Sequence, residues 1–417
     1  MSSRHLALAA LRRWRTGAEF SDQVVGDLFS RGGLSAADRA FALELFYGAL
    51  RNLTLLDFWI GQLRAAPVDA QSRDILRLGL YQILLIETAA HAAVFETVEL
   101  APARARGLIN ALLRRALREK DRLTSLADEQ PLATRFSHPE FLVAKWMSQF
   151  GTEATYDLCR WNNLPAPVSA RINSLKISAA DFLGKYPGAV LLPGRENFVT
   201  LSEPADALRN GDCYIQDPST VLACELLAPL PNETVLDACA APGGKSSYLA
   251  AMMQNSGSHV AADRDDLRLE RLRGNLTRLG VANATIVRCD WREPESIRAA
   301  QFQPQSFHRI LLDVPCSNTG VMRRRVDLRW RLRPNEFATM QAQQLAILEN
   351  VAPLLKPGGS LVYSTCSLEP EENEEVIDEF LAAHLDFCLT ESQRSHPIRD
   401  GFDGAYAARL HRPVVVE

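Results

Sequence analysis

The sequence lacks the features that mark secreted, membrane-bound and metal-binding proteins. It has no run of about 18 uncharged apolar residues, so we expect no membrane-spanning helix. Its N-terminus lacks the order of a basic start, an apolar core and a small-residue cleavage site, which argues against a signal peptide. Its 8 cysteines include no CxxC pair, so we expect neither a metal site nor a disulfide framework. These absences together predict a protein of the reducing cytoplasm.

What the sequence contains is typical of a globular protein with several domains. Its 417 residues are 47% hydrophobic and 23% charged, and this length predicts two or three domains. The formal net charge is −4, which on its own argues against nucleic-acid binding. The distribution of charge matters more than its sum, and two segments are strongly basic, Arg104 to Arg122 and Val321 to Arg333.

The pattern of apolar residues predicts three regions. Residues 1–130 form a helical region, in which DILRLGLYQILLIE, apolar nearly all round, is predicted as the central helix of a bundle. Residues 131–215 are predicted to form a small α+β connector. In residues 216–417, short apolar strands alternate with helices, which predicts an α/β domain with a parallel sheet covered by helices on both faces. Ligands of such sheets bind at the carboxyl ends of the strands.

One helix of the third region is defined by its own pattern. Four leucines recur on one face of DDLRLERLRGNLTRLG, and Gly280 is the expected stop after them. We therefore predict that this face is buried, through Leu269, Leu272, Leu276 and Leu279.

A glycine-containing loop, DACAAPGGKSS, follows the first predicted strand of this region and opens a helix. Gly243 and Gly244 let the backbone approach a ligand closely, although a plain strand-to-helix turn has the same features. The loop is neither GxGxxG nor GxxxxGK[ST], which disfavours dinucleotides and triphosphates. Asp263 ends the second strand, where an acid accepts ribose hydroxyls, and Asp290 ends the third, where it can face an adenine amine. These strand ends fit a nucleoside-bearing cofactor, and S-adenosylmethionine suits them better than NAD.

Two cysteines and an aspartate follow the next two predicted strands. Asp313 and Cys316 come at the end of the fourth (DVPCSNTG), and Cys366 at the end of the fifth (STCS). If these strands are neighbours, their ends lie about 5 Å apart. A thiolate that adds to carbon 6 of a pyrimidine makes carbon 5 nucleophilic towards a methylsulfonium. One cysteine can be this nucleophile, a second can assist release, and the Asp313 acid can hydrogen-bond N3 and the amine of cytosine. Either cysteine alone could equally be a buried small hydrophobe.

These motifs resemble those of a known family. DACAAPGGK, DVPCSNTG and YSTCSLEPEEN are similar to the three signature blocks of RNA 5-methylcytosine methyltransferases of the Nol1/Nop2/Sun family. The resemblance implies a Rossmann-like class I methyltransferase domain that uses S-adenosylmethionine. It implies that Cys366 attacks carbon 6 and that Cys316 helps to release the product. It also implies cofactor contacts at Cys239, Ala240, Ala241, Pro242, Gly243, Gly244, Lys245, Asp263, Asp290 and Asp313.

The N-terminal region adds to the resemblance. AADRAFALELFYGALRN, LRLGLYQILL, HAAVFETVELA and GLINALLRR resemble an all-α NusB-like domain, which is fused to bacterial members of the family that methylate a cytosine in 16S rRNA. The resemblance implies an RNA-binding role for residues 1–130, with 16S rRNA as the partner, and we expect a monomer. The sequence departs from the family at Phe95, where Asn is more usual, and at Arg325 and Val326, where His and Pro are usual.

Two charged segments flank the predicted site. The basic segment that follows Cys316 is expected to bind RNA phosphate or base, through Arg323, Arg324, Arg325, Arg329 and Trp330, although an arginine run can also be a solvated face. The acidic run after Cys366 is interpreted as a helix N-terminus, where acids favour the helix dipole: Glu371, Glu372, Glu374 and Glu375.

Three functions remain to be weighed. The sequence favours an RNA cytosine-C5 methyltransferase, acting on 16S rRNA or, alternatively, on tRNA or another RNA. A non-catalytic RNA-binding or ribosome-assembly module is the second possibility, and the presence of both cysteines, Asp313 and the full CAAPGGK loop argues against it. A nicotinamide-dependent oxidoreductase is the third, because the sheet type is shared, and the missing GxGxxG disfavours it.

Overall fold

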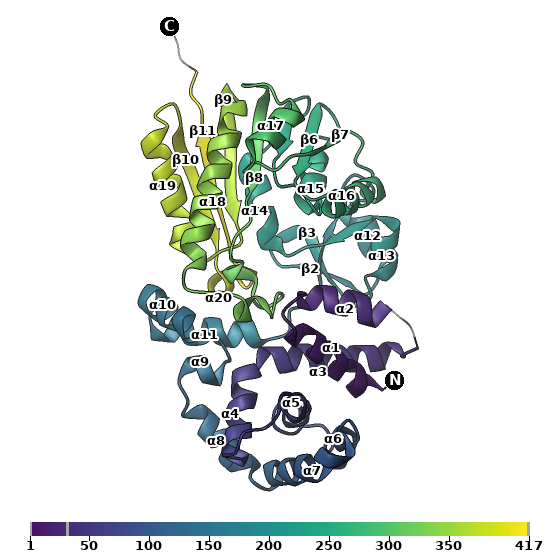
Figure 1. The fold of residues 1–417 in the computed structure, drawn as a ribbon. Helices are drawn as coiled ribbons and strands as arrows, with labels where there is room; N and C mark the ends of the chain where they lie inside the picture. Colours follow the sequence, from purple (N-terminus) through teal and green to yellow (C-terminus); the bar gives the residue numbers. More distant parts are fainter. Residues whose placement is uncertain (1, 31–32, 415–417) are drawn as a thin grey trace. The chain divides into compact units, whose positions relative to one another are not determined.

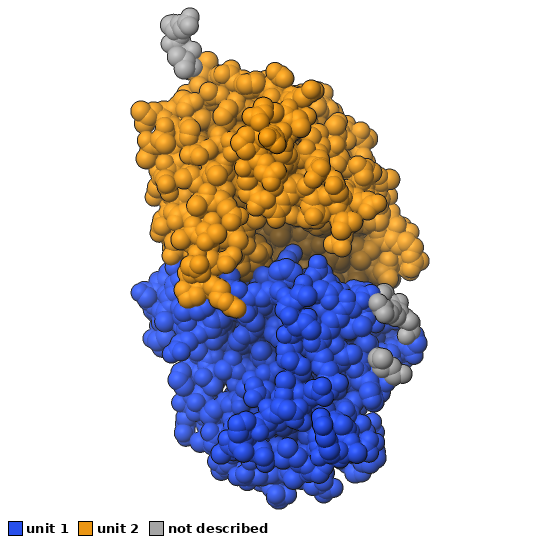
Figure 2. Space-filling model, in the orientation of Figure 1, with its two compact units in different colours: residues 1–165, 322–332 blue, residues 166–321, 333–417 orange. Residues whose placement is uncertain are grey.

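The computed structural model describes residues 2–30 and 33–414, and the chain forms two compact units (Figure 2). The first unit contains residues 1–165 and 322–332, and the second contains residues 166–321 and 333–417. These units do not divide at the predicted boundaries, because the predicted connector 131–215 contributes helices to the first unit and strands to the second. Among the described residues, no helix is both long enough and apolar enough to cross a membrane.

The first unit is helical throughout its main segment (Figure 1). Its central helix is α5, in which nearly every residue from Ser72 to Leu84 is buried, as its apolar circumference predicted. Asp69 caps this helix by accepting hydrogen bonds from the backbone N–H groups of Gln71 and Ser72. The helices are α1 (Ser3–Arg15), α2 (Ser21–Ser30), α3 (Ala36–Arg51), α4 (Leu53–Leu63), α5 (Ala70–Leu84), α6 (Ala90–Val98), α7 (Ala103–Arg118), α8 (Lys120–Asp128), α9 (Leu132–Arg135), α10 (Glu140–Phe150) and α11 (Thr152–Asn163).

The distant segment 322–332 completes the core of this helical unit. Val326 is fully buried in the same hydrophobic cluster as the helices, and the ring of Trp330 packs against that cluster. Asp327 caps the start of α2, because its carboxylate accepts from both the backbone N–H and the hydroxyl of Ser21, each at 2.8 Å. The segment therefore belongs structurally to the helical unit, although the methyltransferase-like motifs lie on either side of it in the sequence.

Arg329 is the most deeply buried arginine of this segment, with 0% of its surface exposed. Its guanidinium donates to the side-chain oxygen of Asn163 at 2.7 Å, to the carbonyl of Asn162 at 3.0 Å and to the carbonyl of Ser137 at 3.2 Å. The two carbonyls lie in the last turn of α11 and just beyond α9, where backbone carbonyls have no partner within the helix. A side chain held in this way cannot reach RNA, so the RNA-binding prediction is wrong for Arg329.

The second unit begins with a small antiparallel sheet of order β2–β3–β1–β4. Arg171 of β1 is buried and connects this sheet to the start of α15 (Gly244–Met252), where it donates to the carbonyl of Gly244 at 3.1 Å and to the Ser247 hydroxyl at 2.8 Å. The elements of this part are β1 (Ser169–Ile172), α12 (Ala179–Lys185), β2 (Ala189–Leu192), β3 (Arg195–Leu201), α13 (Ala205–Asn210), β4 (Cys213–Ile215), the short helix η1 (Pro218–Val221) and α14 (Leu222–Leu227).

A seven-stranded sheet forms the centre of the second unit, in the order β10–β11–β9–β8–β5–β6–β7 (Figure 1). The five strands predicted from the sequence pair in parallel, and β8 and β9 are neighbours. The strands are β5 (Thr234–Asp237), β6 (Ser258–Asp263), β7 (Ala284–Arg288), β8 (Phe307–Asp313), β9 (Leu355–Thr365), β10 (Cys388–Ser395) and β11 (Ala405–His411).

Helices cover both faces of this sheet, as predicted. Side chains alternate along a strand, so Leu236 and Ile310 enter the cluster that contains residues of α18 and α19, whereas Val235 and Leu311 enter the cluster of α14 and α15. The remaining elements are α15 (Gly244–Met252), α16 (Asp266–Leu279), α17 (Pro294–Ala300), η2 (Thr319–Val321), η3 (Leu328–Trp330, in the first unit), α18 (Glu336–Val351), η4 (Ala352–Leu354), η5 (Pro370–Glu372), α19 (Glu374–Ala383) and α20 (Pro397–Asp400).

We predict that Arg329→Ala destabilises the protein by roughly 2–4 kcal/mol, because it leaves a cavity and several buried acceptors without donors. Urea unfolding of the full chain measures the change, with Arg325→Ala as the matched control, since Arg325 is an exposed arginine of the same segment. Equal stability of the two variants would contradict the structural role of Arg329.

Candidate active site

The predicted site residues lie at the carboxyl ends of adjacent parallel strands. Asp237 ends β5, Asp263 ends β6 and Asp313 ends β8. The register of β8 and β9 pairs Asp313 with Ser364, and Cys366 follows the last residue of β9. The parallel order thus brings together residues from three separate motifs, as the alternating pattern predicted.

The loop after β5 is fixed by contacts along its backbone. The N–H of Ala240 donates to the carbonyl of Ala262 at 2.8 Å, and the N–H of Ala241 donates to the Asp263 carboxylate at 3.1 Å. Gly243 has a φ of +106°, and a Cβ there would lie 2.9 Å from a methyl group of Leu272. Glycine is therefore favoured at this turn mainly by its conformation, because this φ is strained for residues that carry a Cβ.

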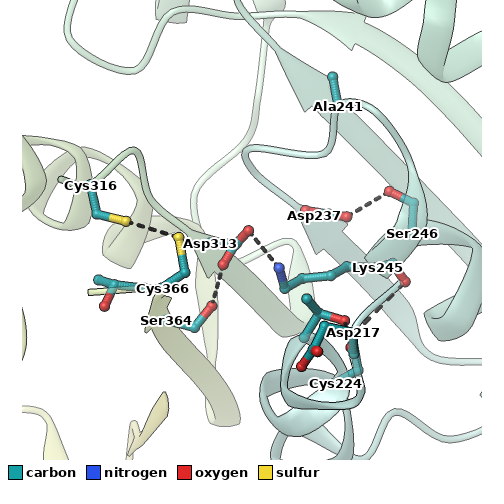
Figure 3. Close-up of polar contacts among 12 residues, drawn as sticks. Asp217, Cys224, Asp237, Ala241, Lys245, Ser246, Asp313, Cys316, Ser364 and Cys366 are labelled. Atoms are coloured by element: carbon teal, nitrogen blue, oxygen red, sulfur yellow. Dashed lines mark hydrogen bonds and ion pairs between the residues drawn. The ribbon is translucent and has the colours of Figure 1, made fainter. Parts of the chain in front are cut away.

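Asp237 has one carboxylate oxygen that is satisfied and one that is not. Its Oδ2 accepts from the Ser246 hydroxyl at 2.6 Å (Figure 3), but its buried Oδ1 has no hydrogen-bond partner among the described residues. Burial raises the pKa of this carboxyl to about 7. A buried acceptor without a donor favours a ligand that brings one, and the ammonium group of S-adenosylmethionine is such a donor. The residues present therefore fit this cofactor.

The other two predicted cofactor acids are already engaged by protein groups. Asp263 is 3% exposed, accepts from the backbone N–H groups of Ala241 and Arg264, and forms an ion pair with Arg268. Asp290, just beyond β7, accepts two hydrogen bonds from the Arg292 guanidinium and one from the Arg292 backbone N–H, and these bonds lower the pKa of its carboxyl. A ribose or adenine contact at these acids would therefore use acceptor positions that the protein leaves available.

Asp313 lies between the glycine loop and the cysteines. Its Oδ2 accepts from the Lys245 ammonium at 2.7 Å, and its Oδ1 accepts from the Ser364 hydroxyl at 2.8 Å (Figure 3). Burial alone would lower the pKa of Lys245, but the attraction of Asp313 and its hydrogen bond outweigh burial and raise it. Lys245 is therefore a permanent cation beside Asp313.

The two predicted catalytic cysteines face each other. The Sγ atoms of Cys316 and Cys366 are 3.3 Å apart (Figure 3). Cys316 is buried and Cys366 is half-buried. The hydrogen bond to Cys366 and burial both raise the pKa of Cys316, which therefore remains a thiol. Cys366 also contacts Asn318, whose Oδ1 lies 3.1 Å from its sulfur.

A buried glutamate that the sequence pattern misassigned joins the two cysteine loops. Glu372, interpreted as one of several acids at a helix start, has 0% of its surface exposed. It accepts from the Ser317 N–H at 2.8 Å, from the Ser317 hydroxyl, from the Ser367 hydroxyl at 2.7 Å and from the Gln344 amide at 2.9 Å. Ser317 follows Cys316 and Ser367 follows Cys366, so one carboxylate holds both loops. The sequence offered one sign of this arrangement, namely the serine that follows each of the two cysteines.

Of the other residues predicted to bind RNA, two contact protein groups and two are at least partly exposed. Arg323 lies over the ring of Trp161 at 4.1 Å and donates to the carbonyls of Leu164 and Pro165. Trp330 donates to the carbonyl of Leu50 at 3.0 Å. Arg325 is exposed and Arg324 is half-buried. No group of His, Cys, Asp and Glu that could hold a metal ion occurs among the described residues.

The fold and the site define a class I methyltransferase, and comparison with known proteins gives its family. A family model described as 16S rRNA methyltransferase RsmB/F matches residues 224–411. A NusB family model matches residues 1–118, and a model of the ferredoxin-like domain of RsmF/B-like methyltransferases matches residues 138–186. The probable ribosomal RNA small subunit methyltransferase B of Bacillus subtilis is 36% identical over 405 residues, which cover 93% of this chain and 89% of the relative. The corresponding Vibrio cholerae enzyme is 36% identical over 397 residues, covering 90% of each chain.

Solved structures agree with these relatives. The crystal structure of PH0851 is 25% identical, covers 99% of both chains and superposes with a TM-score of 0.79. A methyltransferase homologue from Pyrococcus horikoshii is 30% identical, covers 70% of this chain and 99% of its own, and has a TM-score of 0.59. This chain therefore belongs to the 16S rRNA methyltransferase RsmB/F family, and the predicted family, fold and cofactor, S-adenosylmethionine, are confirmed. The oxidoreductase alternative is set aside.

We predict that Asp237→Asn removes a pH-dependent loss of stability. The wild-type carboxyl has a pKa of about 7 in the folded protein and an ordinary value of 3.8. Between these values the folded state binds more protons than the unfolded chain, so the free energy of unfolding falls as pH rises from about 4 to 7. Across this pH range, the free energy of unfolding of wild type should fall by on the order of 2–4 kcal/mol more than that of Asp237→Asn.

Urea unfolding at a series of pH values, without cofactor, measures this difference, with the exposed Asp121→Asn as the control. The same pH dependence in wild type and Asp237→Asn would show that this carboxyl is not held protonated.

Proposed function

We propose that the protein transfers a methyl group from S-adenosylmethionine to carbon 5 of a cytosine in 16S rRNA, through a covalent bond between Cys366 and carbon 6. The observation that carries the proposal is the pair of thiols 3.3 Å apart, beside the Asp313–Lys245 ion pair at the carboxyl ends of β8 and β9. The relatives are named ribosomal RNA small subunit methyltransferase B, and this supports RNA as the substrate.

The proposed reaction explains why a thiol stands at the end of β9. Carbon 5 of cytosine is a poor nucleophile. Once Cys366 has lost its thiol proton to water, its sulfur adds to carbon 6 and turns carbon 5 into an enamine carbon. The bound cofactor supplies an electrophilic methyl group. The ring then loses its carbon 5 proton to water and expels the Cys366 sulfur, which restores the double bond.

The different surroundings of the two cysteines support different roles. Cys366 is half-buried and comes at the strand end, so its sulfur is the more accessible nucleophile. Cys316 is buried, and its raised pKa keeps it a thiol. A thiol beside the Cys366 sulfur can donate a hydrogen bond to it as the carbon–sulfur bond breaks, which makes the sulfur a better leaving group.

Asp313 and Lys245 are positioned to recognise the base. An ionised carboxylate only accepts hydrogen bonds and an ammonium only donates them. Asp313 can therefore accept from the exocyclic amine of cytosine, while donation to ring N3 needs Lys245 or a protonated Asp313. This arrangement refines the sequence-based expectation, in which the Asp313 acid alone served both positions.

A cytosine inside a helix cannot present carbon 6 to a thiol, so the target must be unpaired or flipped out. We assign RNA binding to the helical unit, where α7 carries exposed arginines at helical spacing, Arg104, Arg114 and Arg118. Arg325 is a further exposed cation of the same unit. Phosphate contacts of this kind hold RNA without reading its sequence.

We predict that Cys316→Ala accumulates a covalent protein–RNA adduct and that Cys366→Ala forms none. The first variant retains the nucleophile but loses the group that assists its departure, and the second loses the nucleophile. A denaturing gel after incubation with 16S rRNA and S-adenosylmethionine measures the adduct, with Cys388→Ala, an exposed cysteine on β10, as the matched control.

The reverse pattern of adducts would exchange the two cysteine roles and leave the reaction in place. Methyl transfer to tRNA but not to 16S rRNA would change the substrate. No transfer and no adduct with either RNA would favour a non-catalytic RNA-binding module.

A further inference from the structure

Asn318 contacts both cysteines of the site, and the proposed reaction gives it no role. Its side-chain Nδ2 donates to the carbonyl oxygen of Cys316 at 2.6 Å, and its Oδ1 lies 3.1 Å from the sulfur of Cys366. Its backbone has a φ of +59°, a left-handed conformation in which asparagine is tolerated better than most residues. The carboxamide thus lies between the backbone of Cys316 and the sulfur of Cys366.

The chemistry of the contacts determines their direction. A backbone carbonyl can only accept, so the amide nitrogen of Asn318 must face Cys316, and the amide oxygen must face Cys366. That oxygen can also only accept, so the single proton of the Cys366 thiol points to it. The contact between the two sulfurs then has one possible donor, Cys316. The hydrogen bonds run from Cys316 to Cys366 to Asn318.

We propose that Asn318 is a further catalytic residue, which holds Cys366 as a thiol until the substrate is bound. The proposal rests on the proposed function, in which the Cys366 sulfur is the reacting atom. A thiolate has no proton to donate, and its negative charge would face the oxygen of the carboxamide. The contact is made by the thiol and cannot be made by the thiolate, so it must be broken before attack.

Asn318→Gly removes this contact with little other change. Glycine adopts a φ of +59° without strain. The loop retains the backbone hydrogen bonds from Gly320 N–H to the Cys366 carbonyl at 3.0 Å and from Val321 N–H to the Asn318 carbonyl at 3.1 Å. Glu372 also continues to hold Ser317 and Ser367. The two cysteine loops are therefore expected to stay in place.

The test is the rate at which iodoacetamide alkylates Cys366, since only the thiolate attacks this reagent. Mass spectrometry of the peptide that contains Cys366 measures the rate in the full chain, without RNA or cofactor. Exposed Cys388 serves as an internal reference in every sample.

We predict that Asn318→Gly raises the alkylation rate of Cys366 by about two- to tenfold, the range that loss of one ordinary hydrogen bond represents. Asn318→Asp should lower the rate, because an ionised carboxylate still accepts from the thiol and repels the thiolate more strongly. The rate at Cys388 should not change.

An unchanged or lower rate in Asn318→Gly overturns the proposal, and so does a raised rate in Asn318→Asp. The outcome is separate from that of the proposed function. Shifts of the predicted sign support the role of Asn318 even where methyl transfer fails, and unchanged rates overturn it even where methyl transfer succeeds.

Discussion

The buried carboxylate of Glu372 is the constraint on which the geometry of the two cysteines depends. A carboxylate removed from water must be compensated by hydrogen-bond donors, and its donors here come from Ser317, Ser367 and Gln344. The first two are the residues that follow Cys316 and Cys366. Meeting the hydrogen-bonding needs of one buried group therefore fixes the ends of β8 and β9 against each other, and the separation of 3.3 Å between the two sulfur atoms follows from it.

The three acids at the ends of β5, β6 and β8 show how one sheet edge gives like groups different properties. Asp263 is satisfied by backbone N–H groups and Asp313 by a lysine and a serine, whereas Asp237 retains an oxygen without a partner among the described residues. Two of these acids therefore have hydrogen-bond donors from the protein, and the third has an oxygen that can accept from a ligand. The donor group of a ligand is thus directed to the end of β5, and the cysteines lie on the opposite side of Asp313 from Lys245 (Figure 3).

The sequence predicted the parts of the fold that follow from local periodicity and chain order. The burial of α5, the leucine face of α16 and its end at Gly280 depend on neighbouring residues, and each is present. The convergence of Asp313, Cys316 and Cys366 followed from a general rule for parallel strands. Strands β10 and β11 were not predicted, because β10 is polar and mostly exposed at the sheet edge, and only its pairing with β11 defines it.

The site residues that the sequence did not reveal are those whose role depends on long-range contacts. An acid in an acidic run looks solvated, and nothing local distinguishes Glu372 from Glu375, which is exposed. Asn318 looks like an ordinary turn residue, and only the fold shows that its amide contacts the carbonyl of Cys316 and the sulfur of Cys366. In both cases the role depends on which distant residues the side chain contacts, and only the tertiary structure shows those contacts.

The arginine-rich segment after Cys316 illustrates the same limit and has a structural consequence. An arginine run of this kind predicts either an RNA contact or a solvated face, but Val326, Asp327 and Arg329 are buried among the helices. The chain passes between the two units after residues 165, 321 and 332, so residues 1–165 alone lack part of their own core. The helical unit is therefore complete only when the methyltransferase sequence is present, because burial of Arg329 provides donors for carbonyl groups that the ends of α9 and α11 leave unpaired.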